Sequence, residues 1–288
     1  MAERWDGASW RRVPAVSPAP EFNGFKAVAA IGRADVWAVG DFGSRRWALM
    51  EHWNGSSWRR VKLPRAARLA DLRDLVAIEA NDVWAIGSSH LSGRGRTLHW
   101  DGSSWTLIPS VRAPVGQFLS LLAGAATGPN DVWAVGDTSA SGLTLHWDGR
   151  SWRRFRDPPH TENTAVVAIT PNDAWTAGRD NNGSAYVKHW DGTAWTAVSV
   201  GPEILAPSGL AAASSANVWG VGPFPQTSRP ASEHWDGTSW TRVSSQTPNA
   251  EELDSIAYVP GTPGTYWAVG SARAPVPQFS RPLIITRC

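Results

Sequence analysis

The sequence is poor in cysteine and has no long apolar run. Its 288 residues include one cysteine, Cys288, so no disulfide can form within the chain. A lone cysteine fits a reducing compartment without proving one, because closed repeat folds need no disulfides. No apolar stretch approaches the ~18 residues of a membrane-spanning helix, and we expect no membrane partner. Repeat sequence begins by Trp5 and leaves no room for a signal peptide, which predicts a cytoplasmic protein. A secreted protein whose leader had been removed would read the same.

Charge and familiar chemical motifs are scarce as well. A net charge of +2 with 18% charged residues predicts no polyanion-binding patch, so nucleic acid is not an expected partner. The sequence has no phosphate-binding glycine loop, no His-Glu-x-x-His, no cysteine pair for zinc and no EF-hand loop. Residues 180–183 (DNNG) could offer oxygens to a cation, but they also form an ordinary turn sequence. We therefore expect neither a metal nor a cofactor.

Two short motifs recur along the chain. The heptad at residues 234–240 (HWDGTSW) has five near-copies, which begin at Arg4, His52, His99, His146 and His189. Asp-Gly between two aromatic-bearing runs predicts a β-hairpin, because both residues accept the backbone angles of a tight turn. The second motif, residues 35–40 (DVWAVG), recurs around Trp84, Trp133, Trp175, Trp219 and Trp267. Six copies of each motif indicate a repeat protein.

The spacing of the motifs predicts the fold. The first tryptophans of the heptads are separated by 48, 47, 47, 43 and 45 residues. One blade of a β-propeller has about this length, since WD-type repeats run ~40–45 residues and kelch repeats ~50. Each repeat contains four short strand-like segments separated by turns, which we label A, innermost, to D, outermost. The sequence therefore predicts one all-β domain over residues 1–288, a six-bladed β-propeller of four-stranded antiparallel blades.

The ends of the sequence predict how the ring closes. The last repeat supplies strands A (about 253–259), B (265–270) and C (about 281–287), while the N-terminal segment 8–13 lacks a partner in its own repeat. Pairing this segment into blade six as its strand D would remove two exposed strand edges. In this alignment Cys288 falls at the position of the tryptophan that ends strand C, and Trp5 aligns with the same position. We interpret Cys288 as a packing residue because no base for a thiol nucleophile is visible.

The repeated aromatic and histidine residues are interpreted as structural. Eighteen of the 19 tryptophans fall on three positions per blade, as expected for packing between blades. Trp47 is left over and is a candidate ligand-binding residue. The repeated histidines are predicted to lie opposite a turn serine, as His52 lies opposite Ser57, and to bond to it. The aspartate before each Val-Trp, such as Asp35, is predicted to cap the A–B turn.

Sequence variation gathers at one end of the blades. The A–B and C–D turns are nearly constant, whereas the B–C loops and D–A connections share no motif from repeat to repeat. Loops on a rigid framework commonly carry function. A lectin with one sugar site per blade would repeat its contact residues, so these loops predict a single asymmetric site on the variable face.

Alignment of strand A identifies candidate residues at the mouth of the channel. Lys26, Asp74 and Asp254 are candidate catalytic residues, and Arg73 and Glu252 are candidate ligand-binding residues. In blade three the alignment places Leu119 and Ser120 at the same position. Opposite charges at such sites also form ordinary solvated ion pairs, and that alternative stays open.

Two histidines lie outside the repeat, in loops of the variable face. His160 has Asp157 and Glu162 nearby and is a candidate catalytic acid or base, although a lone loop histidine is more often merely exposed. His90 is a candidate ligand-binding residue.

The two motifs, DVWAVG and HWDGTSW, resemble those of the Trp-rich β-propeller repeat proteins common in actinobacteria, over practically the whole chain. The hairpins are also similar to the Asp-box of sialidase-type propellers, but Asp and Gly are adjacent here, so no catalytic residue carries over. Propellers host many functions. The leading hypothesis is a monomer that binds a single small-molecule or glycan-like ligand at the channel mouth. The alternatives are a metal-independent enzyme of lyase or cyclase type at the same site and a protein-interaction platform.

Overall fold

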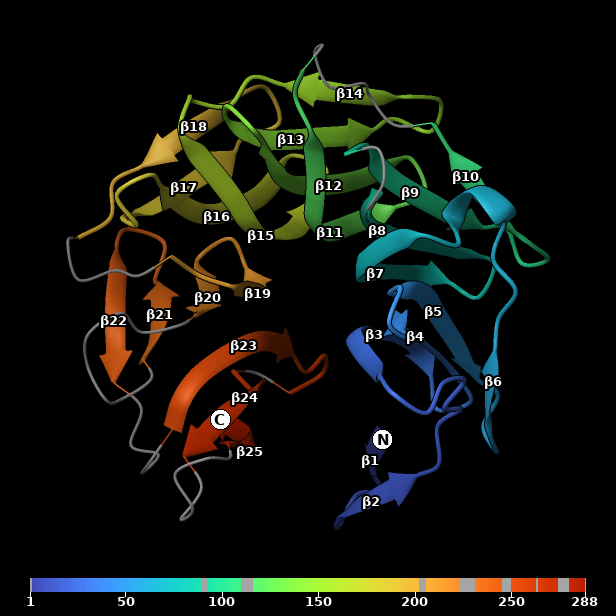
Figure 1. Cartoon of the computed structure of the whole chain (residues 1–288). Coiled ribbons are helices and arrows are strands. Elements are labelled where there is room, and N and C mark those ends of the chain that lie inside the picture. Colours follow the sequence, from blue (N-terminus) through green and yellow to red (C-terminus); the bar gives the residue numbers. More distant parts are fainter. Residues whose placement is uncertain are drawn as a thin grey trace.

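The computed structural model describes residues 2–89, 93–109, 116–201, 206–222, 231–244, 250–262, 264–273 and 280–287. The chain forms an all-β propeller, as predicted, with six blades around a central channel (Figure 1). Within each blade consecutive strands pair antiparallel, from the innermost strand A outwards. Among the residues that the structure describes, one short 3₁₀ helix, η1 (Arg65–Ala67), interrupts the strands. In the described part of the chain no helix is long and apolar enough to cross a membrane.

The first three blades have four strands each. Blade one contains β3 (Asn23–Gly32), β4 (Asp35–Phe42), β5 (Trp47–Trp53) and β6 (Trp58–Arg60). Blade two contains β7 (Ala70–Glu79), β8 (Asp82–Ser89), β9 (Gly95–Trp100) and β10 (Trp105–Ile108). Blade three contains β11 (Leu119–Gly128), β12 (Asp131–Thr138), β13 (Gly142–Trp147) and β14 (Trp152–Phe155).

The remaining blades continue the series up to the last, which has three strands. Blade four contains β15 (Thr161–Thr170), β16 (Asp173–Asp180), β17 (Ala185–Trp190) and β18 (Trp195–Val198). Blade five contains β19 (Gly209–Ser214), β20 (Asn217–Val221), β21 (Ala231–Trp235) and β22 (Trp240–Ser244). Blade six contains β23 (Ala250–Tyr258), β24 (Tyr266–Arg273) and β25 (Ser280–Arg287).

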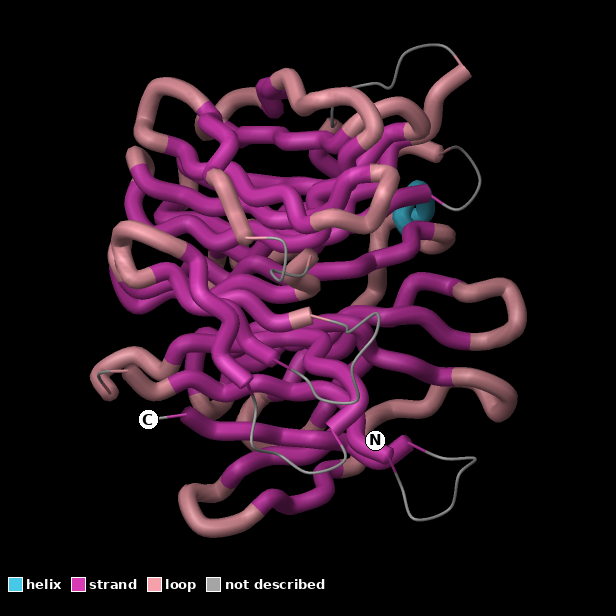
Figure 2. The backbone as a smooth tube through the Cα atoms, turned by 90° about the vertical axis from the view of Figure 1, so that its left-hand side faces the viewer, coloured by secondary structure: helices cyan, strands magenta, loops and turns pink. Residues whose placement is uncertain are grey.

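The N-terminal segment forms a hairpin of β1 (Ala2–Trp5) and β2 (Trp10–Val13) beside the last blade. The rings of Trp5 and Trp10 lie 6.0 and 5.7 Å from the ring of Trp267 in β24. In the side view both chain ends lie at a similar height in the lower half of the molecule (Figure 2). Among the described residues β2 pairs with β1, and its predicted pairing with β25 as strand D of blade six stays a prediction.

The repeated tryptophans pack between blades, as predicted. Trp84 of strand B is buried, and its ring lies 5.2 Å from Trp147 and 5.6 Å from Trp152 of the next blade. Flat side chains at the same register in successive blades thus contact one another across the interfaces between blades. Each such pair adds ~0.5–1.5 kcal/mol to the free energy of burial.

The heptad turn is longer than predicted, and this changes the partner of its histidine. Trp53 lies opposite Trp58, so four residues form the turn and His52 lies opposite Arg59 rather than Ser57. The ring of His52 stacks on Trp37 at 4.2 Å, and its Nε2 donates to Asp35 Oδ1 at 2.7 Å. The predicted His–Ser bond was therefore wrong, whereas the predicted capping of the A–B turn by Asp35 stays a prediction.

The turn itself is held by its aspartate. Asp101 Oδ1 accepts the backbone N–H groups of Ser103 and Ser104, both at 2.8 Å. In a two-residue turn the two N–H groups after the glycine would belong to the paired strand and could not both reach the aspartate. The hydrogen bonds to the aspartate therefore stabilise the four-residue turn. The histidines and aspartates of the repeat thus have structural roles on the constant face.

A β-bulge interrupts strand A in five blades near the variable face. The register shifts between Phe25 and Ala27 in blade one and between Leu72 and Asp74 in blade two. In blade three the shift falls between Leu121 and Ala123, so the equivalent of the blade-two pair is Leu122 and Ala123, and the predicted Leu119 and Ser120 were wrong. A bulge re-aims the side chain of its extra residue. The extra residues are Lys26, Arg73, Leu122, Thr164 and Asp254.

The glycine that ends each DVWAVG motif is explained by this bulge. A Cβ at Gly40 would overlap the carbonyl oxygen of Gly24, and one at Gly136 would overlap that of Ser120. Strand A approaches strand B closely where its register shifts, so only glycine fits opposite.

Candidate functional site

The bulge residues surround a cavity at the centre of the ring. It has a volume of about 590 Å³ and is lined by strand A of all six blades. Four of the predicted residues line it together: Lys26, Arg73, Asp74 and Asp254. They come from blades one, two and six, and the bulges of β3, β7 and β23 direct them to the same space.

Lys26 and Arg73 belong to a chain of alternating charges on blades one and two. Lys26 Nζ donates to Asp41 Oδ2 at 3.1 Å and to Asp71 Oδ1. Arg46 donates to the same Asp41 oxygen at 3.2 Å, and Arg73 Nη2 donates to Asp71 Oδ2 at 2.6 Å. Burial tends to raise the pKa of Asp71, but the Lys26 hydrogen bond and the charges of both cations lower it below its ordinary value.

This network fixes two cations at the cavity wall. The Lys26 side chain is 24% exposed and that of Arg73 is 45% exposed, so both keep access to a ligand while paired. Asp41 is 1% exposed and anchors the network from beneath. An ammonium shared by two carboxylates is suited to hydrogen bonding rather than to attack as a free amine.

Asp74 is held against the channel wall by two backbone donors. Its Oδ1 accepts the N–H of Leu75 and its Oδ2 accepts the N–H of Gly124 in blade three, each at 2.8 Å. Burial raises the pKa of Asp74 to about 6, against the lowering effect of these two N–H groups. The carboxyl therefore titrates close to neutral pH while it joins blades two and three.

Asp254 lies on the blade-six side of the cavity. It is exposed, and partial desolvation by the surrounding strands raises the pKa of its carboxyl. Ser208 and Ser255 add hydroxyl groups to the lining, and Ala27 and Ala165 add small apolar surface. Glu252, also predicted, is half-buried on β23 opposite Ser271 and is not among the described residues that line this cavity.

Trp47 lines a different cavity, on blade one. This space of about 500 Å³ is also lined by Phe42, Arg60 and Arg68. The guanidinium of Arg60 lies over the Phe42 ring at 4.3 Å. Trp47 is therefore not part of the channel mouth.

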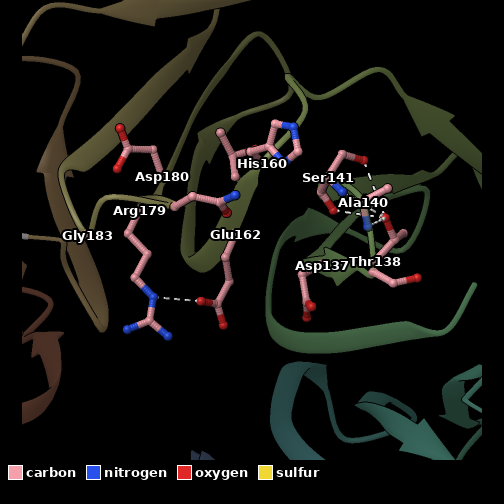
Figure 3. A pocket seen from close by; sticks show the side chains of 12 residues that line it. Asp137, Thr138, Ala140, Ser141, His160, Glu162, Arg179, Asp180 and Gly183 are labelled. Atoms are coloured by element: carbon pink, nitrogen blue, oxygen red, sulfur yellow. Dashed lines mark hydrogen bonds and ion pairs between the residues drawn. The ribbon is translucent and has the colours of Figure 1, made fainter.

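His160 lines a third cavity, between blades three and four on the variable face (Figure 3). The cavity has a volume of about 450 Å³, and its charged lining comes from the ends of β12 and β16, the start of β15, and His160 just before β15. Arg179 Nε donates to Glu162 Oε2 at 2.7 Å, and Asp137 faces them (Figure 3). Burial and repulsion from Glu162 raise the pKa of Asp137 to about 6, while Arg179 opposes the rise.

The predicted group of His160, Asp157 and Glu162 is only partly brought together. His160 and Glu162 share the cavity, but Asp157 is buried and forms an ion pair with Lys188. Thr144 and Asn163 also donate to Asp157 Oδ1, at 3.0 and 2.9 Å. Asp157 is thus a structural link within the core and is not oriented toward His160.

Several charged residues of these cavities were missed by the sequence reasoning. Asp137 and Arg179, which line the third cavity, and Asp41, which pairs with Lys26, each follow directly on the glycine that ends the DVWAVG-type motif, which is a signal that the repeat alignment offered. Asp180 at the start of the next loop accepts the N–H groups of Asn182 and Ser184, both at 2.9 Å, as an ordinary turn does. His90 lies outside the described residues. Within them, no group of three or more His, Cys, Asp or Glu residues could hold a metal ion.

Comparison with known proteins identifies the fold of the chain but assigns it to no family. No protein-family model matches the chain, and no curated protein matches it. Among solved structures it is similar to YCF48 bound to D1 peptide, with a TM-score of 0.59 and 15% identity over 90% of this chain and 82% of that one.

Two lectin structures are similar to a comparable degree. The fucose-specific lectin from Aleuria aurantia has a TM-score of 0.57 and 14% identity over 86% of this chain and 88% of that one. The SapL1 lectin in complex with alpha methyl fucoside has a TM-score of 0.54 and 14% identity over 84% of this chain and 92% of that one. At these identities the likeness shows the fold alone, and the chain is a six-bladed β-propeller related in structure to these proteins.

Proposed function

We propose that this protein binds one small, hydroxyl-rich, glycan-like ligand at the mouth of the channel on the variable face. The observation that carries the proposal is the convergence of Lys26, Arg73, Asp74 and Asp254 on one cavity of about 590 Å³. Cavities of ~300–1,000 Å³ with a few convergent polar groups are typical of small-molecule sites.

The lining of the cavity suits a polyol. Lys26 and Arg73 present donors, Asp254 presents an acceptor, and Ser255 can act as either. Small apolar residues such as Ala27 leave room for the C–H face of a sugar ring between them. Hydroxyl groups that bridge donors and acceptors on opposite walls would fix the orientation of such a ligand.

The asymmetry of the lining supports one ligand per chain. The extra residues of the five bulges are Lys, Arg, Leu, Thr and Asp, so no two blades offer the same group. The structural likeness to fucose lectins supports a glycan-like ligand, and the likeness to YCF48 with its peptide supports the alternative of a protein-interaction platform. From the DVWAVG and HWDGTSW motifs we also propose that the chain belongs to the Trp-rich propeller repeat proteins.

A glycan array followed by calorimetry tests the proposal. The first probe is alpha methyl fucoside, alongside the glycans that give the strongest array signals. The double variant Lys26→Ala/Arg73→Ala should weaken binding at least about tenfold, since each lost charge-assisted bond contributes ~1.5–3 kcal/mol. Arg59→Ala is the matched control, because Arg59 is an exposed cation at the opposite, constant end of blade one. Equal affinities of the double variant and the wild type would refute the proposed site.

A metal-independent enzyme of lyase or cyclase type is the second candidate. The observation that favours it is the pair of carboxyls in the cavity, Asp74 and Asp254, whose pKa values are both raised. A carboxyl whose pKa is raised holds a proton at higher pH than an ordinary carboxyl and can act as a general acid or base. Turnover of a bound glycan that Asp254→Asn abolishes while binding persists would establish this candidate. Binding with no turnover would leave the lectin-like function.

A further inference from the structure

The contacts between tryptophans follow one rule from blade to blade. The strand-B tryptophan of each of the first four blades contacts two tryptophans of the next blade, one that ends strand C and one that opens strand D. The strand-C contacts have ring separations of 5.0–5.3 Å and interplanar angles of 52–60°. The strand-D contacts have separations of 5.0–5.8 Å and angles of 76–87°.

Trp267 of blade six obeys the same rule, but its partners are on the N-terminal hairpin. Its ring lies 6.0 Å from Trp5 at 56° and 5.7 Å from Trp10 at 72°. The angle of 56° falls within the range of the strand-C contacts and the separation of 5.7 Å within that of the strand-D contacts, while the separation of 6.0 Å and the angle of 72° lie just outside those ranges. The β1–β2 hairpin therefore takes the place of the outer half, strands C and D, of a blade that follows blade six.

The position where strands A and B of such a blade would lie is bordered on both sides by exposed valines. The residue two positions after the strand-B tryptophan is 0–2% exposed in blades one to five, yet its equivalent in blade six, Val269, is 42% exposed. On the other side, Val28 in strand A of blade one is 67% exposed, whereas its equivalents Leu75 and Val166 are each 7% exposed. Both valines face the space where strands A and B would lie.

The edge of β1 faces the same space. Each strand C of the four-stranded blades pairs with a strand B on one side and a strand D on the other, while in the described part of the chain β1 pairs with β2 alone. The channel cavity extends between these surfaces, since Ala2 and Glu3 of β1 line it together with Trp58, Val28 and Val269. An unpaired strand edge beside exposed apolar faces is a template for strand addition.

We propose that the opening between blades one and six is a docking site for a β-hairpin of another polypeptide with the strand A and strand B pattern of this repeat. Its second strand pairs with β1, as each strand B pairs with its strand C. A tryptophan on that strand packs on Trp58, the strand-D tryptophan of blade one, and displaces the Arg4 guanidinium, which lies 6.0 Å from the centre of the Trp53 ring in the free chain. Its other apolar residues cover Val28 and Val269, and both faces of the hairpin become buried as in every complete blade.

A synthetic peptide of residues 70–89, which span β7 and β8, tests the proposal. A fluorescently labelled form should bind the full chain saturably in an anisotropy titration. The Val28→Asp and Val269→Asp variants should each bind it at least about tenfold more weakly, because the new charge would be buried without a partner. Both valines are exposed in the free protein, so folding should survive, as circular dichroism melting would verify.

Matched controls separate docking from unspecific adhesion. Phe118→Asp removes another exposed apolar side chain, 50% exposed and outside the opening, and should leave the affinity unchanged. The peptide with Trp84→Ala should bind at least about tenfold more weakly. Hydrogen exchange of the β1 amides should slow when the peptide is bound. No saturable binding, or equal loss of affinity in Phe118→Asp and Val28→Asp, would overturn the proposal.

Discussion

The equivalent valines Val135 and Val269 offer a sharp test of how the blades pack. Both lie two residues after a strand-B tryptophan, but Val135 is 0% exposed and Val269 is 42% exposed. Substitution by alanine removes the same two methyl groups from each. The two variants therefore differ only in the environment from which the methyl groups are lost.

The expected losses follow from burial. At ~0.8 kcal/mol for each buried carbon, Val135→Ala loses about 1.6 kcal/mol of transfer free energy. A residual cavity of ~50 Å³ adds about 1 kcal/mol at ~24 cal/mol per Å³. Val269→Ala loses only about 1 kcal/mol of transfer free energy, because part of the side chain is already exposed to water, and water fills the space that the methyl groups leave. The variants should thus differ by about 1.5 kcal/mol in free energy of unfolding.

Urea denaturation followed by tryptophan fluorescence measures this difference. The comparison is valid where the two variants show the same dependence on urea concentration as the wild type. Losses that agree within ~0.5 kcal/mol would refute the reasoning, because they would mean that blade six is covered as fully as blade three.

Three further predictions concern buried polar groups. Asp131→Ala should destabilise the protein by about 2 kcal/mol in urea denaturation, because His146 Nε2 loses its acceptor at 2.6 Å, while Asp131→Asn should cost less, as blade five already carries asparagine there. Lys188→Met should cost about 3–5 kcal/mol in the same assay by leaving Asp157 charged and buried, and Lys188→Met/Asp157→Leu should recover much of the loss. As the pH rises from 4 to 7, the free energy of unfolding of the wild type should fall by up to about 3 kcal/mol relative to that of Asp74→Asn. The reason is that a pKa raised to about 6 makes Asp74 hold its proton more tightly in the folded chain than in the unfolded chain, and this advantage is lost once the carboxyl ionises. A constant difference across this pH range, or no recovery in the double variant, would contradict the respective predictions.

Most of the fold could be predicted from the sequence because the repeat places the same signals in every blade. Tryptophans at fixed spacing and Asp-Gly turns predict six four-stranded blades because packing and turn chemistry are local and periodic. The same reasoning failed for His52, whose partner depends on turn length. The four-residue turn arises from side-chain acceptors on Asp101 and its equivalents, which the Asp-Gly pair alone does not reveal.

The candidate site was predictable where it follows the repeat and not where it depends on irregularity. Lys26, Arg73, Asp74 and Asp254 meet in one cavity because alignment of strand A captured the bulge in blades one, two and six. Blade three was misaligned because a bulge has no sequence signal of its own beyond the glycine opposite it. Trp47 and His160 lie in cavities of their own, since the paths of variable loops are set by tertiary contacts.

The most direct test of the proposed single site is the number of ligand molecules bound per chain. Native mass spectrometry with the glycan that gives the strongest array signal, or with alpha methyl fucoside, measures this number. One ligand per chain, lost in the Lys26→Ala/Arg73→Ala variant and kept in Arg59→Ala, is the expected result. Five or six ligands per chain, or one ligand that persists in the double variant, would show that binding belongs to the repeat or to another cavity and not to the channel mouth.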